Sequence, residues 1–302
     1  MEQGARRVSE VLAMSSSIDP KKRYLIVNAD DLGVSRSVNR AIFEAFERGI
    51  VTSASLMATG DEFDNAIDGA LARPRLGVGV HLVLHDERPV APVARIPALV
   101  GRDGRMKSLG SVVRALFFGR IPREQIEIEY AAQIERVRAR GLQPTHLDSH
   151  CHLHALPALG RIVHELGAKN GIVCARRPEF SSLSEFQGAP ISRYPLSILI
   201  TLSNKFGSKS DRLTTPDEFV GLVKSGEVDA AWVERALSKL TRGKISELMV
   251  HPSDGSDGGD ADAKYGANRR RTEFEAVTAP QVRAALARYD VELVDYRFLA
   301  AR

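Results

Sequence analysis

The 302-residue sequence contains few cysteines and no recognisable phosphate-binding glycine turn. Its two cysteines, Cys151 and Cys174, lie far apart and form no CxxC pair, which argues against a disulfide framework and against a thiolate zinc knuckle. No GxGxxG or GxxxxGK[ST] turn follows a β-rich run, so the nucleotide-binding α/β folds lack their usual sequence support. The cysteine usage favours a reducing, cytoplasmic compartment, and the missing glycine turns argue against a nucleotide-binding site.

Long apolar runs and basic tracts are also lacking. No stretch approaches the roughly 18 apolar residues of a membrane span, and the N-terminus lacks the apolar core of a signal peptide. The 42 Lys and Arg and the 38 Asp and Glu are interspersed, and the longest basic run, 269–271, has no aromatic residues interleaved. We therefore expect no transmembrane segment, no nucleic-acid partner and a disordered leader over residues 1–20.

The sequence does contain a repeating order of short β-rich runs and helix-like segments. The first run, YLIV at 24–27, precedes an amphipathic helical spacing that ends at Gly49. Such alternation predicts an α/β protein with a largely parallel sheet, closed or nearly closed into one barrel domain over 21–302, with long insertions at 85–122 and 180–230. The seven expected strands lie at 24–27, 50–58, 76–84, 144–150, 171–176, 246–251 and 291–298.

Polar residues cluster where these runs end. Asp30 and Asp31 follow the first run within VNADDLG, His81 comes late in the third run, and His251 closes the sixth. The carboxyl ends of parallel barrel strands form one face, so we expect these groups to converge there. Two adjacent carboxylates beside a cavity repel each other, and a proton, a cation or a metal must stabilise them.

The densest histidine cluster is THLDSHCHLH, which holds four of the eight histidines of the chain: His146, His150, His152 and His154. Imidazoles with an aspartate nearby and no thiolate pair suit an open site for Zn²⁺ or a similar divalent ion. Alternate residues of a strand face the same side, so all four histidines cannot bind one ion without a bend. Some of them must hold other ligands in place or contact a substrate.

Simpler explanations exist for several of these residues. A histidine within an apolar run, such as His81, is often a satisfied core residue. One of the two acids, Asp30 or Asp31, could cap a helix over 34–48. The loop 251–262 has an aspartate spacing that does not fit a calcium-binding EF-hand. A glycosidase with a carboxylate pair is a weaker reading, because adjacent acids do not straddle a glycosidic bond, and a non-catalytic sugar-binding barrel is a third.

Taken together, the motifs NADDLG, GIVTSASLM, GVGVHLVL, PTHLDSHCHLH and ELMVHPSDG resemble the YdjC-like carbohydrate deacetylases, which are related to the chito-oligosaccharide deacetylases. The resemblance extends from about residue 24 to about residue 298. The segments HLVLHDERPVAPVARIPALVGRDGRMKS and RALFFG look most like the branch associated with hopanoid biosynthesis. The resemblance implies a distorted NodB-like (β/α) barrel that removes the N-acetyl group from an N-acetylglucosaminyl substrate. A glycosylated hopanoid is the favoured substrate and a chito-oligosaccharide the alternative.

The resemblance also implies roles for particular residues. By motif, Asp31, His81 and His150 hold one divalent metal ion, with Zn²⁺ favoured and Mg²⁺ the alternative. Asp30 then takes the position of the general base, and His251 is the candidate general acid. The residues expected to contact the substrate are Asn28, His146, Asp148, His152, His154 and Arg176.

Two apolar segments, 112–118 and 195–206, could serve a lipid-linked substrate. The second has the spacing of a helix with an apolar face, which could contact a polycyclic lipid or the inner face of the membrane, whereas ordinary core packing or a homodimer contact explains it equally. One departure from the family pattern lies within the histidine cluster: Cys151 stands where a polar residue is commoner.

Overall fold

The computed structural model describes residues 18–179, 198, 200–202, 213–257 and 267–302. One seven-stranded sheet organises them, in the order β4-β3-β2-β1-β6-β5 with β7 paired to β1, and every strand pair is parallel. The prediction of an α/β protein with about seven largely parallel strands is therefore confirmed. The strands are β1 Arg23–Leu32, β2 Ser53–Leu56, β3 Gly77–Leu82, β4 Leu147–Ser149, β5 Glu218–Val220, β6 Ile245–Val250 and β7 Val291–Val294.

The central strand β1 explains why the apolar run at 24–27 is continuous rather than alternating. All of its residues after Arg23 are buried, because neighbouring strands line both edges and helices cover the sheet. Parallel strands buried on both faces read as uninterrupted apolar runs. The strand therefore carries Asp30 and Asp31, near its carboxyl end, into the interior of the molecule.

The sheet curls towards closure through isolated contacts instead of a regular strand. Leu147 of β4 forms a parallel bridge with Ala175, and Cys174 forms another with Thr214, just before β5. The strand predicted at 171–176 is thus reduced to two bridging residues. The strand β5 was not predicted, because its three residues lie in the segment 180–230 that was assigned to an insertion.

The last predicted strand also ends earlier than expected. β7 stops at Val294, because the Asp295 side chain accepts hydrogen bonds from the backbone N–H groups of Arg297 and Phe298 and caps a short helix there. A carboxylate at this position stabilises the first turn of a helix by satisfying its free N–H groups. The predicted strand 291–298 is therefore half strand and half helix.

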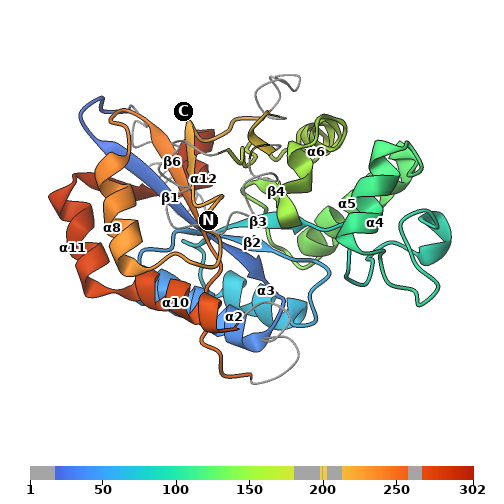
Figure 1. Ribbon diagram of the computed structural model, residues 1–302, viewed down its shortest axis with the longest axis horizontal. Coiled ribbons are helices and arrows are strands. Elements are labelled where there is room, and N and C mark those ends of the chain that lie inside the picture. Colours follow the sequence, from blue (N-terminus) through green and yellow to red (C-terminus); the bar gives the residue numbers. More distant parts are fainter. Residues whose placement is uncertain (1–17, 180–197, 199, 203–212, 258–266) are drawn as a thin grey trace, which may run out of the picture.

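Helices surround the sheet (Figure 1). α2, α3 and α10 lie below the strands in that view, α8 and α11 lie on the left, and α4, α5 and α6 lie on the right. The predicted helix 34–48 is confirmed, with Ser35 accepting from the Val38 N–H at its start and Gly49 at its end. The helices are α2 Arg36–Arg48, α3 Phe63–Leu71, α4 Leu109–Phe117, α5 Arg123–Ala139, α6 Pro157–Asn170, α8 Ala230–Lys239, α10 Ala267–Thr278, α11 Pro280–Arg288 and α12 Tyr296–Ala300, with 3₁₀ turns η1 Val93–Arg95 and η2 His150–Ala155.

Two expectations fall partly or wholly on residues that the structure does not describe. The leader predicted for 1–20 lies outside the described residues up to 17, and the apolar segment 195–206 is described only at 198 and 200–202. Ile200 is buried in a small apolar cluster, whereas Ile198 and Leu202 are about half exposed. Within the described part of the chain, no helix combines the length and apolar character needed to cross a bilayer.

Candidate functional site

The polar residues predicted to converge do so at the carboxyl ends of the parallel strands. Asp30 and Asp31 belong to β1 and His81 to β3, while His150 and His251 directly follow β4 and β6. The parallel register of β3 and β4 also sets His81 opposite Asp148. Side chains that are widely separated in sequence are therefore close neighbours in the fold.

A bulge near the end of β1 lets two consecutive acids face the same site. Successive residues of a regular strand point to opposite faces. The pairing of β1 with β2 shifts register between Ala29 and Leu32, and Asp31 has a φ of 67°, in the left-handed region that aspartate tolerates better than most residues. The alternation is broken there, and Asp30 and Asp31 both come within reach of His81.

Asp31, His81 and His150 form a group whose ligand atoms lie within 4.8 Å of one another. The Asp31 Oδ1 atom lies 3.4 Å from His81 Nε2 and 3.2 Å from His150 Nδ1. This oxygen is buried, yet among the described residues it accepts no hydrogen bond of regular geometry. One carboxylate and two imidazoles around an unsatisfied oxygen fit a divalent cation with an open coordination position.

Asp148 orients His81 within this group. Its Oδ1 atom lies 2.9 Å from His81 Nδ1, and the interaction favours a proton on Nδ1. The lone pair of Nε2 is then available on the side of Asp31, as in the carboxylate–histidine pairs that support metal ligands. Ser55 Oγ also donates to Asp148 Oδ2 at 2.8 Å, and the carboxylate is held on both oxygens.

Arg270, on α10, completes the surroundings of Asp31 by donating to its Oδ2 atom. Burial alone would raise the pKa of Asp31, but the charges of Arg270 and the neighbouring histidines outweigh burial and hold that pKa well below its ordinary value. Asp31 is therefore an ionised carboxylate, the form that can bind a metal ion.

Arg176 lies at the centre of a buried ion network. Its guanidinium donates to both oxygens of Asp30 at 2.6 Å and to Glu247 Oε1 at 2.8 Å, and its Nη1 atom forms an ion pair with Asp148 Oδ2 at 2.7 Å. Burial would raise the pKa of Asp30, but Arg176 outweighs it and keeps the pKa below its ordinary value. With its side chain fully buried, Arg176 fits a positioning role better than the substrate contact expected from the sequence.

We expect the Arg176→Met substitution to lower the free energy of unfolding by about 3–5 kcal/mol, because it leaves Asp30, Asp148 and Glu247 buried without their common cation. Urea unfolding followed by circular dichroism measures this difference. Arg177→Met is the matched control, since the Arg177 side chain is 37% exposed and its pair with Glu179 spans 3.5 Å, a geometry worth about 1 kcal/mol or less. Equal unfolding midpoints for the two variants would contradict the central role of Arg176.

The other residues expected to contact substrate are also largely enclosed. Asn28 donates to Asp30 Oδ1 and to Ser55 Oγ, both at 2.8 Å, and its side chain supports the carboxylate. His146 stacks on Tyr296 with ring centroids 3.7 Å apart, and burial lowers its pKa to about 3, so it is a neutral core residue.

His152 and His154 lie in the η2 turn, near each other and near β5. His154 Nδ1 lies 2.6 Å from Ser149 Oγ, and its Nε2 lies 3.2 Å from the Arg176 carbonyl. Burial lowers the pKa of His154 to about 4 and lowers that of His152 well below its ordinary value, and both rings are neutral. The His152 ring lies edge-on to Phe219. His154 therefore links the turn to the backbone of Arg176, whereas His152 is half-buried beside the site.

His251 lies at the edge of the site with its side chain 17% exposed. Its Nε2 atom is 3.9 Å from Asp30 Oδ2, and its Nδ1 atom is 3.5 Å from Glu273 Oε2.

Sequence reasoning missed the supporting residues Glu247, Arg270 and Glu273. A glutamate inside the apolar run SELMV was a usable signal for Glu247, because an unpaired acid is rarely buried.

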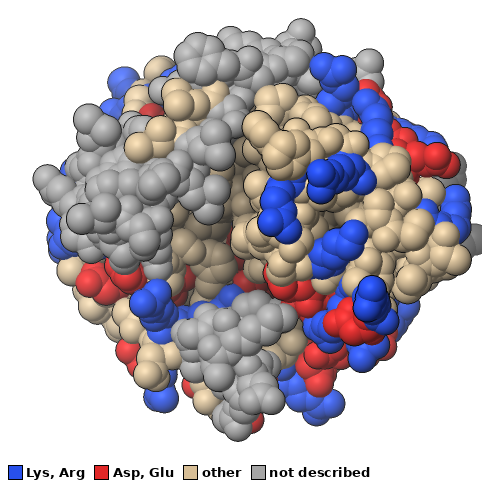
Figure 2. Space-filling model, turned by 45° about the vertical axis from the view of Figure 1, so that its right-hand side comes forward, with Lys and Arg blue, Asp and Glu red and all other residues tan. Residues whose placement is uncertain are grey.

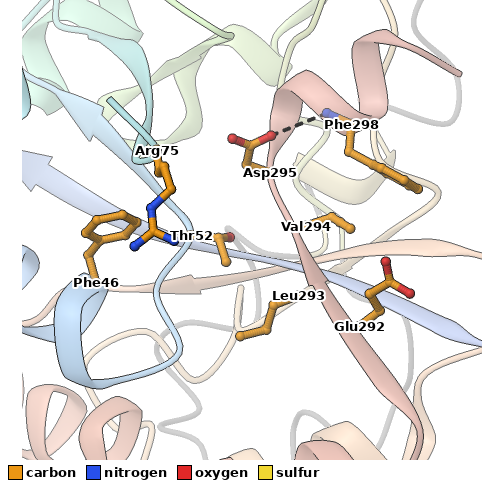
Figure 3. Close-up of a pocket in the computed structure, with 8 residues that line it drawn as sticks. All are labelled: Phe46, Thr52, Arg75, Glu292, Leu293, Val294, Asp295 and Phe298. Carbon is orange, nitrogen blue, oxygen red and sulfur yellow. Dashed lines mark hydrogen bonds between the residues drawn. The ribbon is translucent and has the colours of Figure 1, made fainter. Parts of the chain in front are cut away.

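Two views show hollows on the surface of the molecule. Figure 2 shows a depression near the centre of one face, with acidic side chains towards its floor and basic side chains on the surface around it. Figure 3 shows a separate surface hollow beside β7, lined by residues that include Phe46, Arg75 and Phe298. None of the residues lining that second hollow was predicted as a site residue.

Comparison with known proteins gives consistent similarities. Residues 24–288 match the family described as YdjC-like protein. A carbohydrate deacetylase from Geobacillus stearothermophilus is 35% identical over 275 residues, covering 91% of this chain and 97% of the relative. A chitooligosaccharide deacetylase from Salmonella paratyphi C is 33% identical over 273 residues, covering 88% of this chain and 95% of the relative. A crystal structure of an Enterococcus faecalis protein, whose suggested role is cellobiose-phosphate cleavage, shares the fold with a TM-score of 0.73 and 24% identity over 91% of this chain and 98% of that chain.

Proposed function

Because the chain belongs to the YdjC-like protein family, we propose that it is a metal-dependent carbohydrate N-deacetylase that converts an acetylated amino sugar into acetate and the free amine. The hydrolase class follows from relatives that are carbohydrate and chitooligosaccharide deacetylases along nearly their whole length. The observation that carries the metal requirement is the approach of His81 and His150, at 3.4 and 3.2 Å, to one unsatisfied oxygen of Asp31.

Asp31, His81 and His150 would hold the metal ion. When bound, the ion supplies a Lewis acid that polarises the acetamide carbonyl and lowers the pKa of water towards about 7. Two imidazoles and one carboxylate favour Zn²⁺, and Mg²⁺ is the alternative that a more oxygen-rich shell would prefer.

Asp30 acts as the general base in this proposal. Arg176 donates to both of its oxygens and keeps it ionised. A carboxylate in that state can accept the proton of the attacking water, a contribution typically worth about 10²- to 10⁴-fold in rate. Asn28 helps to fix the same carboxylate.

His251 acts as the general acid. Glu273 lies beside its Nδ1 atom, and its Nε2 atom faces the Asp30 side of the site. A proton on Nε2 can then be donated to the sugar nitrogen as the amide bond breaks, so that the amine leaves in neutral form. Its partial exposure at the rim suits a residue that meets the leaving group.

The activity is tested by measuring metal content and acetate release together. Purified protein is analysed for bound metal and incubated with N-acetylglucosamine, diacetylchitobiose and an N-acetylglucosaminyl glycolipid. We expect acetate from at least one substrate, its loss on chelation and its recovery with added Zn²⁺. Release of free sugar instead of acetate would indicate glycoside hydrolysis. Formation of neither acetate nor free sugar would indicate a non-catalytic sugar-binding barrel.

We further propose that the natural substrate is a glycosylated hopanoid, with a chito-oligosaccharide as the alternative that the relatives' names favour. The proposal is supported by the RALFFG segment, where Phe117 and Phe118 at the end of α4 are 83% and 60% exposed. Adjacent exposed aromatic rings can pack against an apolar lipid body. Contact of this end of α4 with the inner membrane face is part of the same proposal.

We expect the double substitution Phe117→Ser with Phe118→Ser to lower acetate release from the glycolipid by at least about tenfold, because each buried phenylalanine is worth about 1.5–3 kcal/mol. Acetate release from diacetylchitobiose should not change. Leu71→Ser is the control, since Leu71 is 48% exposed at the end of α3. Acetate from diacetylchitobiose alone, with none from the glycolipid, would contradict the hopanoid proposal.

A further inference from the structure

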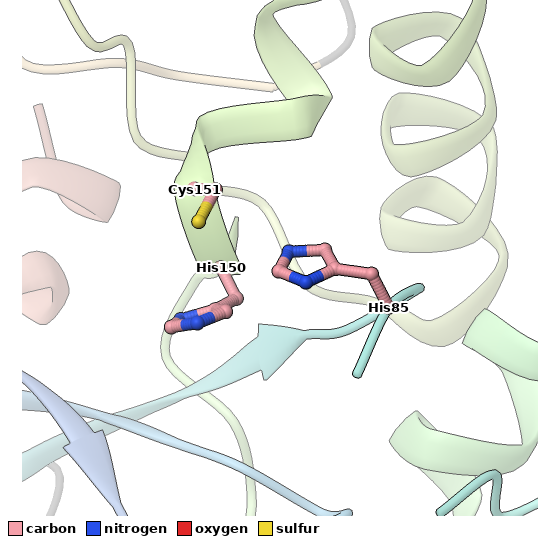
Figure 4. A group of neighbouring side chains, drawn as sticks. All are labelled: His85, His150 and Cys151. Carbon is pink, nitrogen blue, oxygen red and sulfur yellow. The ribbon is translucent and has the colours of Figure 1, made fainter. Parts of the chain in front are cut away.

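A second group of ligand atoms adjoins the first one. His85, His150 and Cys151, here called the Cys151 group, place one ligand atom each within 4.8 Å of one another. Figure 4 shows the His85 ring directed from the chain after β3 towards Cys151, with the His150 ring beside both. The His85 and His150 rings are stacked with centroids 5.1 Å apart.

His85 is oriented in the same way as His81. It is 3% exposed, and its Nδ1 atom lies 2.9 Å from Asp86 Oδ2. Asp86 Oδ2 also accepts from the backbone N–H of Leu109 at 3.1 Å, which holds the carboxylate in place. With the proton on Nδ1, the lone pair of Nε2 faces the Cys151 group. That Nε2 atom is buried and makes no hydrogen bond of regular geometry with the described residues, and it lies near the Cys151 thiol.

An unusual backbone turn presents the thiol. Cys151 has a φ of 53° and His152 a φ of 56°, two consecutive non-glycine residues in the left-handed region. Such conformations persist where the surrounding structure requires them, and they concentrate at sites that clamp ligands. The second cysteine differs, because Cys174 is fully buried in the core and its thiol approaches the Tyr296 carbonyl at 3.5 Å.

We propose that Cys151, His85 and His150 form a second metal position, selective for thiophilic divalent ions such as Zn²⁺ and Cd²⁺. A thiolate with two imidazoles prefers such ions over Mg²⁺. Binding releases the thiol proton to solvent, so no oxidant or reductant is needed. This position goes beyond the deacetylase reaction, which uses neither His85 nor Cys151.

His150 belongs to both ligand groups, and this sharing has a functional consequence. An ion bound by the Cys151 group would be coordinated by the His150 imidazole, which also belongs to the group of Asp31, His81 and His150. Zn²⁺ in excess of one equivalent therefore inhibits the enzyme, whereas Mg²⁺ in excess does not. The Cys151 group is thus a zinc-responsive element beside the catalytic centre.

The probe for the second position is Cd²⁺, titrated into metal-free full-length protein and followed by the ultraviolet charge-transfer absorption of a Cd²⁺–thiolate bond. We expect the band in the wild-type protein, its retention in Cys174→Ala and its loss in Cys151→Ser. Asp86→Asn should weaken Cd²⁺ binding by about 10- to 100-fold, the usual effect of removing a carboxylate that orients a histidine ligand. Circular dichroism verifies that each variant is folded.

Two results would overturn the proposal. The first is the absence of the band in wild-type protein, and the second is a band that persists in Cys151→Ser. Because absorption is the readout, neither result depends on whether the protein is a deacetylase. For the sharing of His150, acetate release at high and low Zn²⁺ is compared, and an identical Zn²⁺ response of wild type and Cys151→Ser would overturn it.

Discussion

The Asp31→Asn substitution is expected to leave a folded protein that no longer retains stoichiometric metal and that releases acetate about a thousandfold more slowly. The carboxylate is the only anionic ligand in its group, and a Lewis acid contributes several kcal/mol to such a reaction, at about 1.4 kcal/mol per tenfold in rate. Asparagine is the suitable replacement, because it also tolerates the left-handed backbone at φ 67°. Alanine would mix loss of the ligand with backbone strain.

The control for this variant is Asp290→Asn. Asp290 has a similar φ of 54°, but it is exposed and pairs only loosely with Arg242, at 3.3 Å. We expect its metal content, acetate release and unfolding midpoint to match the wild type. Elemental analysis after dialysis and an acetate assay measure both variants. Full metal content in Asp31→Asn would remove Asp31 from the ligand set.

The Asp30→Asn substitution should have a different signature. We expect metal content to remain near wild type while kcat falls by about 10²- to 10⁴-fold, because an amide cannot accept the proton that a general base removes. Arg176 would keep Asp148 and Glu247 as partners, so that its charge stays compensated. Asp229→Asn is the control, since Asp229 caps α8 through its side chain and asparagine caps a helix equally well.

The two variants together test the assignment of roles. Loss of metal in Asp30→Asn with retention in Asp31→Asn would mean that ligand and base are exchanged. Loss of metal in both would mean that the adjacent acids act as one binding unit. Only the combination of a metal-free Asp31→Asn and a metal-bound, slow Asp30→Asn supports the proposed mechanism.

Much of the fold was predictable from the sequence because its signals are local. The apolar run at 24–27 and the helix 34–48 follow from spacing and capping within a few residues. The strand β5 gave no such signal, since three residues are too few to show a period. The segment 171–176 looked like a strand, yet only Cys174 and Ala175 form bridges there.

The candidate site was likewise predictable from the sequence only in part. That polar residues at the strand ends would converge was predictable, because parallel strands bring their carboxyl ends together, whereas the choice of His81 and His150 as neighbours of Asp31 came from the family resemblance. The buried network around Arg176 was not predictable, since its partners Asp30 and Glu247 lie 146 and 71 residues away in the chain. Which residues touch a substrate and which hold other side chains depends on such distant contacts, and sequence spacing does not report them.

The bulge at the end of β1 makes the site sensitive to the number of residues as well as to their identity. β1 carries more chain than β2 between the pairs Ala29–Ala54 and Leu32–Leu56, and this surplus is what turns both acids inward. Deleting one residue from this segment would restore regular alternation and turn one carboxylate away from the histidines, although every ligand would still be encoded. A homologue with one residue fewer here could therefore match every motif and lack the proposed metal-binding arrangement, so chain length between Asn28 and Gly33 is a criterion for judging whether a relative keeps that arrangement.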